Sequence, residues 1–423
     1  MPSTDDAEPP STVSPLQRSI YRAVEDAFES EQVPFLRSLV DTPSHTAARD
    51  DVEAAAKLVD AKAQQLGLAV ERTPDPEQRF ADHRVFRTPA TEADARSLAL
   101  VGHIDTVFPR SMGFLAMTRD DGPAGPGTGD IVRGPGTLDM KSGLSAVLFA
   151  MQAVRHAAPQ QWERLRLRFL LNSDEEVGSP SSAPMFERVA PLLTGALVFE
   201  AGRTEDRIVT CRKGSARFEF VVEGRSAHAG NQHQEGVNAI AVLAHLVLRA
   251  EAITDYARGV TVNVGIIEGG TAKNTVPDRA RCVIDSRFLT VADAREVVAR
   301  MEALAADPFG DTPVEPRLRE AKVVLVGGVA RPPMEAIEGT QALRLRYERH
   351  AAATGLQVGE APLQGGGSDA NLLAALGVPC IDGLGPHGKF FHNPREWSSL
   401  SSLQRRTQAL ATLLAEEAAG GPQ

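Results

Sequence analysis

The stretch "LRLRFLLNSDEEVGS", residues 165–179, joins an apolar run to three consecutive acids. The run predicts a strand that leads directly into a loop. The acids are Asp174, Glu175 and Glu176. Like charges side by side repel one another, so a chain that only needed solubility could have spread them out. Taken alone, the acids fit an exposed turn, but a bound positive charge would explain them equally well.

Strand-like and helix-like runs alternate on both sides of this stretch. Further strand-like runs cover residues 97–108, 196–202 and 377–385. Apolar residues at helical spacing cover residues 51–68, 141–157 and 401–418. Strands that are separated by helices predict an α/β fold with a mostly parallel sheet and helices on both of its faces.

The middle of the chain follows a different order. Residues 217–230, 259–270 and 280–291 resemble antiparallel strands, with helical runs over 236–253 and 291–306. The order strand, helix, strand, strand, helix predicts a small inserted α+β module of ferredoxin-like type. We therefore expect a discontinuous main domain over 15–213 and 326–423, with the inserted domain over 214–325.

Composition excludes several classes of protein. The 423 residues exceed a typical single domain, and the 42% of apolar residues can supply a core. A formal net charge of −10 without a Lys/Arg cluster speaks against nucleic-acid binding. No run reaches the roughly 18 apolar residues that a membrane span requires.

The N-terminal residues and the cysteines indicate a cytoplasmic protein. Residues 1–14 are acidic and rich in Pro and Ser, and they lack the basic start and apolar stretch of a signal peptide. We expect them to be a disordered tail. The three cysteines, Cys211, Cys282 and Cys380, stand far apart and are odd in number, so no disulfide framework is indicated.

Potential metal ligands recur where strand-like runs end. They are His103, Asp105, Asp139, Glu175, Glu176, Glu200, His387 and His392. In open α/β sheets, sites form at the carboxyl ends of the strands, so these side chains can converge. His, Asp and Glu without Cys suit Zn²⁺, Mn²⁺ or Co²⁺. Two divalent cations would neutralise the carboxylates and explain the crowded acids.

Six motifs occur in one order along the chain: "GHIDTVFP", "GPGTLDMKSG", "SDEEVGS", "FEAG", "GRSAHAG" and "GGGSD". With them the chain resembles the dinuclear zinc hydrolases that include glutamate carboxypeptidases, aminoacylases and the desuccinylases of lysine biosynthesis. The resemblance covers almost the whole chain, from about Val33 to the C-terminal helix. Within that family, the likeness is closest to folate-cleaving glutamate carboxypeptidases.

The resemblance implies a metal-ligand set. Asp139 is expected to bridge two metal ions, because each of its two oxygens can bind one of them. His103 and Glu200 would complete one metal, and Glu176 and His392 would complete the other. Two cations roughly 3.5–4 Å apart can activate a water and clamp the attacked carbonyl oxygen.

The resemblance also implies two residues that act beside the metals. Glu175 would be the general base on a metal-bound water. Neighbouring side chains diverge, so Glu176 can face a metal while Glu175 faces the water. Asp105 lies two residues beyond His103 on the same strand face, where it can accept a hydrogen bond from the imidazole and fix its tautomer.

The last metal ligand has an alternative. His387 also lies near the C-terminal end of the chain, but "FFHNPREW" matches the family's single His followed by a Glu, here His392 and Glu396. The run "PHGKFF" replaces the glycine-rich approach that relatives have. This departure leaves open the substrate, and whether His387 or Lys389 contributes to the pocket.

The inserted domain is implied to be a lid and a dimerisation domain. The resemblance gives His228 an oxyanion-stabilising role across a homodimer, and it gives Asn274 and Arg287 the substrate's carboxylate. A loop histidine and a structural salt bridge are the respective alternatives for His228 and Arg287. Arg287 lies among apolar residues, where a buried cation would need an anionic partner. Gly366 and Gly367 would shape the pocket through close backbone approach.

We therefore expect a homodimeric hydrolase with two divalent metal ions per chain, Zn²⁺ or alternatively Co²⁺ or Mn²⁺. It would cleave an amide or peptide bond beside a free carboxylate, such as that of a C-terminal glutamate. The substrates would be small peptides or N-acyl amino acids. A deacylase or desuccinylase is the nearest alternative. A catalytically silent metal-binding scaffold is a distant one, against which the retention of Glu175 speaks. Neither the substrate nor the native metal follows from the sequence.

Overall fold

The computed structural model describes residues 13–123 and 125–420, and the chain divides into two compact units. Unit 1 comprises Met1–Thr210, Ala336–Pro362 and Ser368–Gln423, and unit 2 comprises Cys211–Glu335 and Leu363–Gly367. Each unit has a hydrophobic core of its own. The expected disordered tail over 1–14 falls, except for Val13 and Ser14, on residues outside the described part.

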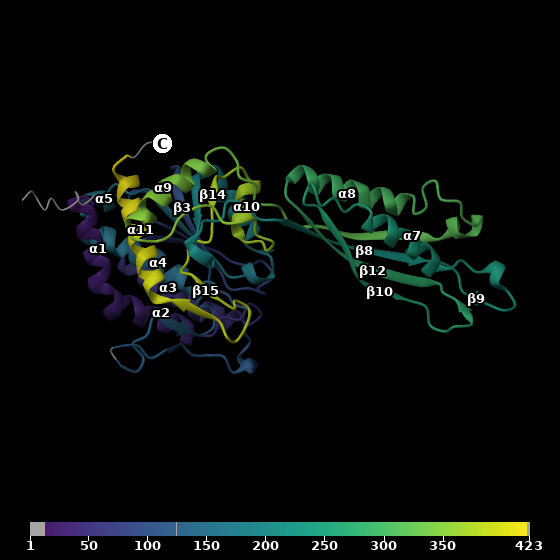
Figure 1. The fold of residues 1–423 in the computed structure, drawn as a ribbon, viewed down its shortest axis with the longest axis horizontal. Coiled ribbons are helices and arrows are strands. Elements are labelled where there is room, and N and C mark those ends of the chain that lie inside the picture. Colours follow the sequence, from purple (N-terminus) through teal and green to yellow (C-terminus); the bar gives the residue numbers. More distant parts are fainter. Residues whose placement is uncertain (1–12, 124, 421–423) are drawn as a thin grey trace, which may run out of the picture. The chain divides into compact units, whose positions relative to one another are not determined.

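Unit 1 is an α/β domain, as the alternating sequence pattern predicts. Its longer helices are α1 (Pro15–Ala27), α2 (Val33–Asp41), α3 (Arg49–Gln65), α4 (Lys141–Ala157), α9 (Thr340–Ala353) and α11 (Leu400–Ala418). Shorter ones are α5 (Pro159–Trp162), α6 (Ala183–Val189) and α10 (Asp369–Ala375). Helix α11 packs against α4, and α1 packs against both of them (Figure 1). No helix in the described part of the chain is long and apolar enough to cross a membrane.

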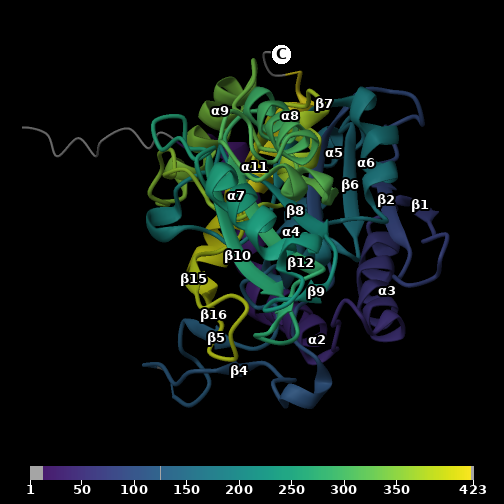
Figure 2. The ribbon, with the colours of Figure 1, turned by 90° about the vertical axis from the view of Figure 1, so that its right-hand side faces the viewer.

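The large sheet of unit 1 is mixed. Its order is β1 (Ala69–Thr73), β2 (His83–Arg87), β6 (Leu167–Asn172), β3 (Ser97–His103), β7 (Leu193–Val198) and β14 (Cys380–Ile381). Strands β6, β3, β7 and β14 run parallel. Strand β2 pairs antiparallel with β6, and β1 pairs antiparallel with β2 at the edge of the sheet (Figure 2). The parallel strands are nearly all buried, as a sheet covered on both faces requires.

Two glycines bring helix α4 close to the ends of β3 and β7. A Cβ on Gly102 would lie 2.6 Å from the Met140 side chain, and one on Gly143 would lie 2.1 Å from the Phe199 carbonyl oxygen. Only glycine permits such approach without moving the backbone. The loop before α4 is therefore held against the carboxyl edge of the sheet.

A second sheet of unit 1 supports two further loops at this edge. Its order is β15 (Gly388–Lys389), β16 (Trp397–Ser399), β5 (Ile131–Arg133) and β4 (Thr118–Arg119). Residues 134–140 follow β5, and residues 390–396 connect β15 to β16. These two loops carry Asp139 and His392.

Unit 2 has the predicted ferredoxin-like topology. Its elements are β8 (Gly214–Glu223), α7 (Ala239–Glu251), β10 (Thr261–Gly269), β12 (Arg279–Phe288), α8 (Val291–Ala306) and β13 (Lys322–Arg331). The sheet order is β10, β12, β8, β13, with every pair antiparallel. A separate pair joins β9 (Ala227–His228) to β11 (Thr275–Val276).

The compact units differ from the domain limits expected from the sequence. The expected limit between 325 and 326 falls inside β13, which pairs with β8 as an edge strand. Gly327 and Gly328 interrupt the apolar pattern of this run, and glycine within a strand obscures the strand signal. Gly327 adopts φ of 104°, and a Cβ there would meet the Arg217 carbonyl oxygen at 2.1 Å.

Candidate metal centre

Five of the predicted ligands converge at the carboxyl edge of the large sheet of unit 1. They come from the end of β3, the loop before α4, the short helix η3 (Glu175–Val177) after β6, the segment after β7, and the loop between β15 and β16. In that order they are His103, Asp139, Glu176, Glu200 and His392. They meet because the neighbouring parallel strands β6, β3 and β7 end at the same edge.

Asp139 lies between two imidazoles. Its Oδ1 is 3.2 Å from His103 Nε2, and its Oδ2 is 3.3 Å from His392 Nε2. Glu200 Oε1 lies 3.6 Å from His103 Nε2, and Glu176 Oε2 lies 3.0 Å from His392 Nε2. The residues thus form two groups that could each hold a metal ion, with Asp139 common to both.

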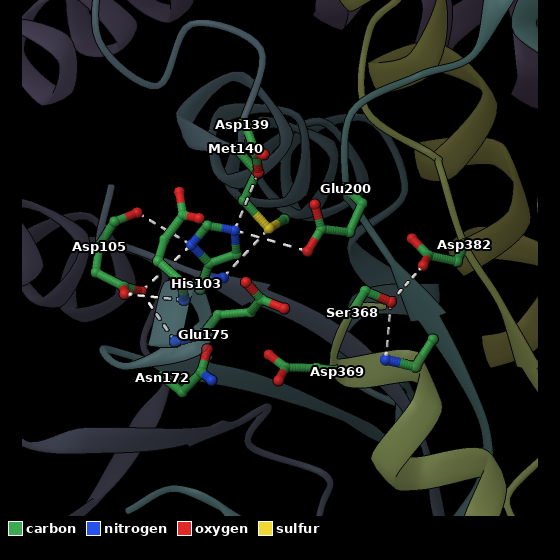
Figure 3. A network of polar contacts seen from close by, with 12 residues as sticks. His103, Asp105, Asp139, Met140, Asn172, Glu175, Glu200, Ser368, Asp369 and Asp382 are labelled. Carbon is green, nitrogen blue, oxygen red and sulfur yellow. Dashed lines mark hydrogen bonds and ion pairs between the residues drawn. The ribbon is translucent and has the colours of Figure 1, made fainter. Parts of the chain in front are cut away.

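The donors fit a divalent transition metal. Both groups offer imidazole nitrogens and carboxylate oxygens and no thiolate, a set that suits Zn²⁺, Mn²⁺ or Co²⁺. Figure 3 shows the His103 ring surrounded by the side chains of Asp105, Asp139 and Glu200. Each oxygen of Asp139 faces a different group, as a bridging carboxylate requires.

The protein alone does not balance the charge of this site. Burial and the nearby Asp139 charge raise the pKa of Glu176 to about 7, and burial and Asp139 raise the pKa of Glu200 well above its ordinary value. Burial lowers the pKa of His103, but hydrogen bonds with Asp105 and Asp139 raise it more, so the net shift is upward. Hydrogen bonds with Asp139 and Glu176 raise the pKa of His392 to about 10. The ionised carboxylates are therefore destabilised in this site, and the positive charge of bound cations would stabilise them.

Asp105 connects His103 to the loop with the consecutive acids. It is fully buried, and its Oδ1 lies 3.3 Å from His103 Nδ1. The same carboxylate accepts hydrogen bonds from the backbone N–H groups of Glu175 (3.3 Å) and Glu176 (3.2 Å), and from the Thr46 hydroxyl (2.7 Å). The Asp105 carboxylate thus contacts both the His103 ring and the backbone of the loop that carries the consecutive acids.

The three consecutive acids have three different environments. Asp174 is fully buried and accepts hydrogen bonds from the N–H groups of Ser181 (2.6 Å) and Ser182 (3.1 Å) and from the Ser182 hydroxyl (2.6 Å). Glu176 belongs to the His392 group, whereas Glu175 belongs to neither metal group. Glu175 is 8% exposed, and its carboxylate points toward the space beside His103 and Glu200 (Figure 3). No role was predicted for Asp174, although the following serines are a typical signal of an acid that closes a turn.

Glu396 binds the backbone of the loop that carries Asp139, and the sequence did not predict this role. It is fully buried and accepts hydrogen bonds from the backbone N–H groups of Gly136 (3.2 Å), Leu138 (2.7 Å) and Asp139 (2.9 Å). Burial raises its pKa to about 8, against the effect of these bonds. From the sequence, Glu396 was used only to identify His392, through the spacing between the two residues in "FFHNPREW". Its contact with a loop some 260 residues away leaves no local signal.

The structure places His392, and not His387, among the candidate ligands. His387 Nδ1 lies 3.5 Å from Asp206 Oδ1, and its ring packs edge-to-face on Trp397 with centroids 6.2 Å apart. The side chain of His392 is 48% exposed, and its Nε2 faces Asp139 and Glu176. Lys389 is exposed and lies three residues before His392.

The expectation that Arg287 is a buried cation is wrong. Its side chain is 38% exposed, and its Nε and Nη2 donate to the Asp285 carboxylate at 2.9 and 3.1 Å. Alternation along β12 explains the difference, because Ser286 and Phe288 face the core while Asp285 and Arg287 face away from it. The guanidinium also donates to the Gly365 carbonyl oxygen at 3.5 Å.

His228 and Asn274 lie together in unit 2. The backbone N–H of Ala229 donates to the Asn274 carbonyl oxygen at 3.0 Å. His228 is exposed, and its Nδ1 accepts from the N–H groups of Gly230 (3.2 Å) and Asn231 (3.1 Å). A neutral imidazole that accepts at Nδ1 carries its hydrogen on Nε2, so His228 can donate from that atom.

Gly366 and Gly367 belong to the short segment of unit 2 that follows Leu363. Arg212 Nη1 donates to the Gly366 carbonyl oxygen at 3.1 Å. A Cβ on Gly367 would lie 2.3 Å from Arg331 Cδ, so this position requires a close approach to the backbone. In unit 2 the two glycines therefore border arginine side chains.

Known proteins match both units. Residues 210–313 match the M20 peptidase dimerisation domain. Carboxypeptidase G2 from a Pseudomonas species is 27% identical over 387 residues, which cover 91% of this chain and 89% of the relative. Over a shorter region, a probable carboxypeptidase from Aspergillus terreus is 31% identical across 59% of this chain and 57% of its own length.

Solved structures share the fold. The aminopeptidase PepT from Bacillus cereus is 22% identical, with a TM-score of 0.70 over 92% of this chain and 98% of that protein. A dinuclear metal-binding peptidase of the M20 family from Bacillus subtilis is 16% identical, with a TM-score of 0.62 over 92% of this chain and 98% of that protein. The chain is thus similar to peptidases of the M20 family, and together with the two candidate metal groups this similarity indicates a hydrolytic metalloenzyme.

Proposed function

We propose that this enzyme is a dizinc carboxypeptidase-type hydrolase that cleaves an amide or peptide bond beside a free carboxylate. The observation that carries the proposal is Asp139, which offers one oxygen to the His103 group and the other to the His392 group. The likeness to carboxypeptidase G2 over 91% of the chain supports the same reaction class. The substrates would be small peptides or N-acyl amino acids.

The two metal ions would be held by His103, Asp139 and Glu200 on one side and by Asp139, Glu176 and His392 on the other. When bound, the cations supply Lewis acidity and neutralise the developing charge of the reaction. The contribution of Asp105 is to fix the His103 ring through Nδ1, which directs Nε2 toward the metal position. Glu396 would hold the backbone of Asp139 in place, because its carboxylate accepts a hydrogen bond from the Asp139 N–H group.

Glu175 would be the general base. Its carboxylate lies beside the metal ligands without belonging to either group, and it is largely shielded from solvent. In this role Glu175 takes a proton from the attacking water and returns it to the leaving amine. The hydrogen bond from its backbone N–H to Asp105 keeps the carboxylate in register with His103.

Three residues of unit 2 would act on the substrate. His228 can donate from Nε2 to the oxyanion, because backbone N–H groups occupy its Nδ1. Arg287 would bind the substrate carboxylate with two parallel hydrogen bonds, in exchange for Asp285, and Asn274 would assist it. The backbones of Gly366 and Gly367 would border the bound substrate.

A homodimer is part of the proposal, with His228 acting across the subunits. Support comes from the match to a dimerisation domain and from apolar side chains left exposed on α7 and β10. These are Ile240 (42%), Leu248 (72%), Ile266 (50%) and Ile267 (59%). A cytoplasmic location is also part of the proposal, and the odd number and wide spacing of the cysteines in the sequence support it.

The test is amine release from a panel of N-acyl and peptidyl amino acids, with Zn²⁺, Co²⁺ or Mn²⁺ supplied in parallel. We expect turnover of substrates with a free α-carboxylate and a large loss when this carboxylate is amidated. Equal turnover of acids and amides would contradict the recognition of a carboxylate. Preference for one acyl group regardless of the amino acid would instead favour the deacylase or desuccinylase alternative. A protein that binds metal but turns over no member would be a silent scaffold.

A further inference from the structure

A buried histidine lies next to the loop that carries the consecutive acids. His83 opens strand β2, and its side chain is fully buried. Because β2 pairs antiparallel with β6, with Arg84 opposite Leu171, His83 lies beside the carboxyl end of β6, where this loop begins. His83 belongs to neither of the candidate metal groups, and the proposed reaction gives it no role.

The imidazole of His83 contacts both ends of this loop. Its Nε2 lies 3.1 Å from the Ser181 hydroxyl, and its Nδ1 lies 3.3 Å from the Ser173 hydroxyl. Both serines are buried, and Glu175 and Glu176 lie between them in the sequence. A single side chain of β2 thus contacts the start and the end of the segment that carries the two glutamates.

Asp75 determines the direction of the hydrogen bond between His83 and Ser181. The buried carboxylate of Asp75 accepts from the Ser181 hydroxyl at 2.8 Å. It also accepts from the backbone N–H groups of Arg79 (2.7 Å) and Phe80 (3.2 Å). Burial raises the pKa of Asp75, but these hydrogen bonds lower it by a larger amount, so the carboxylate is ionised and can only accept. The hydroxyl hydrogen of Ser181 therefore points to Asp75, and His83 donates to Ser181 from Nε2.

Asp174 connects the same groups from within the loop. Its carboxylate accepts from the N–H groups of Ser181 and Ser182, and its Oδ1 lies 4.0 Å from His83 Nδ1. Burying an imidazole costs free energy unless its nitrogens are hydrogen-bonded, whereas a buried network with all its bonds made holds one arrangement. An apolar side chain at position 83 would fill the core without this cost, which favours a positional role for the imidazole.

We propose that His83 is a positioning residue that holds the Glu175 carboxylate where it acts as the general base. This inference rests on the proposed function, which gives Glu175 that role. Glu176 would be fixed by its bond to a metal ion. Glu175 belongs to neither metal group, so the loop backbone has the larger part in placing it. His83 fixes that backbone at both ends through Ser173 and Ser181.

The experiment measures kcat, KM and metal content of the metal-loaded enzyme on the best substrate of the panel. His83→Leu removes both polar contacts with a side chain of similar size. We expect kcat to fall by about tenfold to a hundredfold, because a misplacement of about 1 Å can cost that much, while KM and two metal equivalents per chain are retained. His83→Gln keeps an N–H donor for Ser181 and should recover most of the loss. The control is His350→Leu, which removes a buried imidazole that pairs with Glu416 at 3.0 Å in the same unit and should leave kcat unchanged.

A double-mutant cycle with Glu175→Gln separates positioning of the base from a general loosening of the site. If His83 acts through Glu175, His83→Leu should cause little further loss of kcat in Glu175→Gln, because the group that it positions is already gone. If His83→Leu does not fold, Ser181→Ala takes its place in the cycle. This variant removes the hydroxyl between His83 and Asp75 but keeps the Ser181 N–H for Asp174.

Additive losses in the cycle would overturn the inference, since His83 would then support the whole centre and not Glu175. So would the loss of a metal equivalent in His83→Leu, or an equal fall of kcat in His350→Leu. An unchanged kcat in both His83→Leu and Ser181→Ala, beside a large loss in Glu175→Gln, would refute this inference alone. Full activity of Glu175→Gln would refute the proposed role of Glu175 and this inference with it.

Discussion

The two halves of the candidate metal centre are built differently. In one half, the side chain of His103 is fully buried, and that of Glu200 is 9% exposed. In the other half, the side chain of His392 is 48% exposed, although that of its partner Glu176 is only 4% exposed. His103 ends a central strand of the sheet, whereas His392 lies in the loop between two short strands. One position is thus set by the sheet, and the other depends on a loop.

This difference matters for how each half is held in place. The His103 half is fixed by the parallel register of β3 and β7 and by the glycines that let α4 approach them. The His392 half is fixed by hydrogen bonds and ion pairs around its loop. We therefore expect the same substitution to have unequal effects in the two halves.

The largest expected difference is between His103→Ala and His392→Ala in the metal-free protein. Removing His103 leaves Asp105 and Glu200 buried without the imidazole that faces them, while Asp139 keeps only His392. This loss should lower the free energy of unfolding by about 3–5 kcal/mol. Removing His392 breaks a half-exposed contact, which should cost below about 1 kcal/mol. Urea denaturation in the presence of a chelator measures both. Equal losses would show that the two halves are not different in the way described.

A smaller effect is expected from Asp206→Asn, which loosens the segment leading to His392. Asp206 Oδ1 lies 3.5 Å from His387 Nδ1 and 3.7 Å from Arg406 Nη2, and it accepts from the Ser402 hydroxyl at 3.1 Å. Burial raises the pKa of Asp206, but the interactions with His387 and Arg406 lower this pKa by a larger amount, so the net shift is downward. The substitution should cost about 1–2 kcal/mol of unfolding free energy at pH 7.

The sign of the shift fixes how this loss depends on pH. The folded pKa of Asp206 is below the unfolded value of about 3.9, so its contribution is complete above that value and is lost as the pH falls through the folded pKa. Denaturation curves of Asp206→Asn and wild type should therefore converge in acid, below about pH 4. The exposed Asp311→Asn serves as the control and should track the wild type throughout. A gap between Asp206→Asn and wild type that persisted at the lowest pH would contradict the ion-pair role of Asp206.

Much of the fold could be predicted because its signals are local. Helix α4 occupies the residues expected from apolar spacing, 141–157, and α11 differs from the expected 401–418 by one residue. The ligands could be predicted because each one follows a strand-like run or opens a helix. Chain order then brings them to one edge of the sheet.

The missing parts depend on contacts between distant segments. Glu396 accepts from the loop before α4, and no local pattern announces that pairing. Arg287 was expected to be buried because it lies among apolar residues in "CVIDSRFL". Only the fold decides which face of the strand the core covers, and Arg287 lies on the other face. The domain limit expected after residue 325 falls inside β13, because Gly327 and Gly328 interrupt the sequence pattern of this strand. Pairing with β8 extends β13 to Arg331.

The central claim is that adjacent glutamates separate proton transfer from metal binding. The most direct measurement is the metal content and turnover of Glu175→Gln beside Glu176→Gln. We predict that Glu175→Gln retains two metal equivalents per chain while kcat falls by about 10²–10⁴, the range typical for loss of a general base. Glu176→Gln should instead lose metal from the His392 half. Loss of a full metal equivalent in Glu175→Gln would contradict the account.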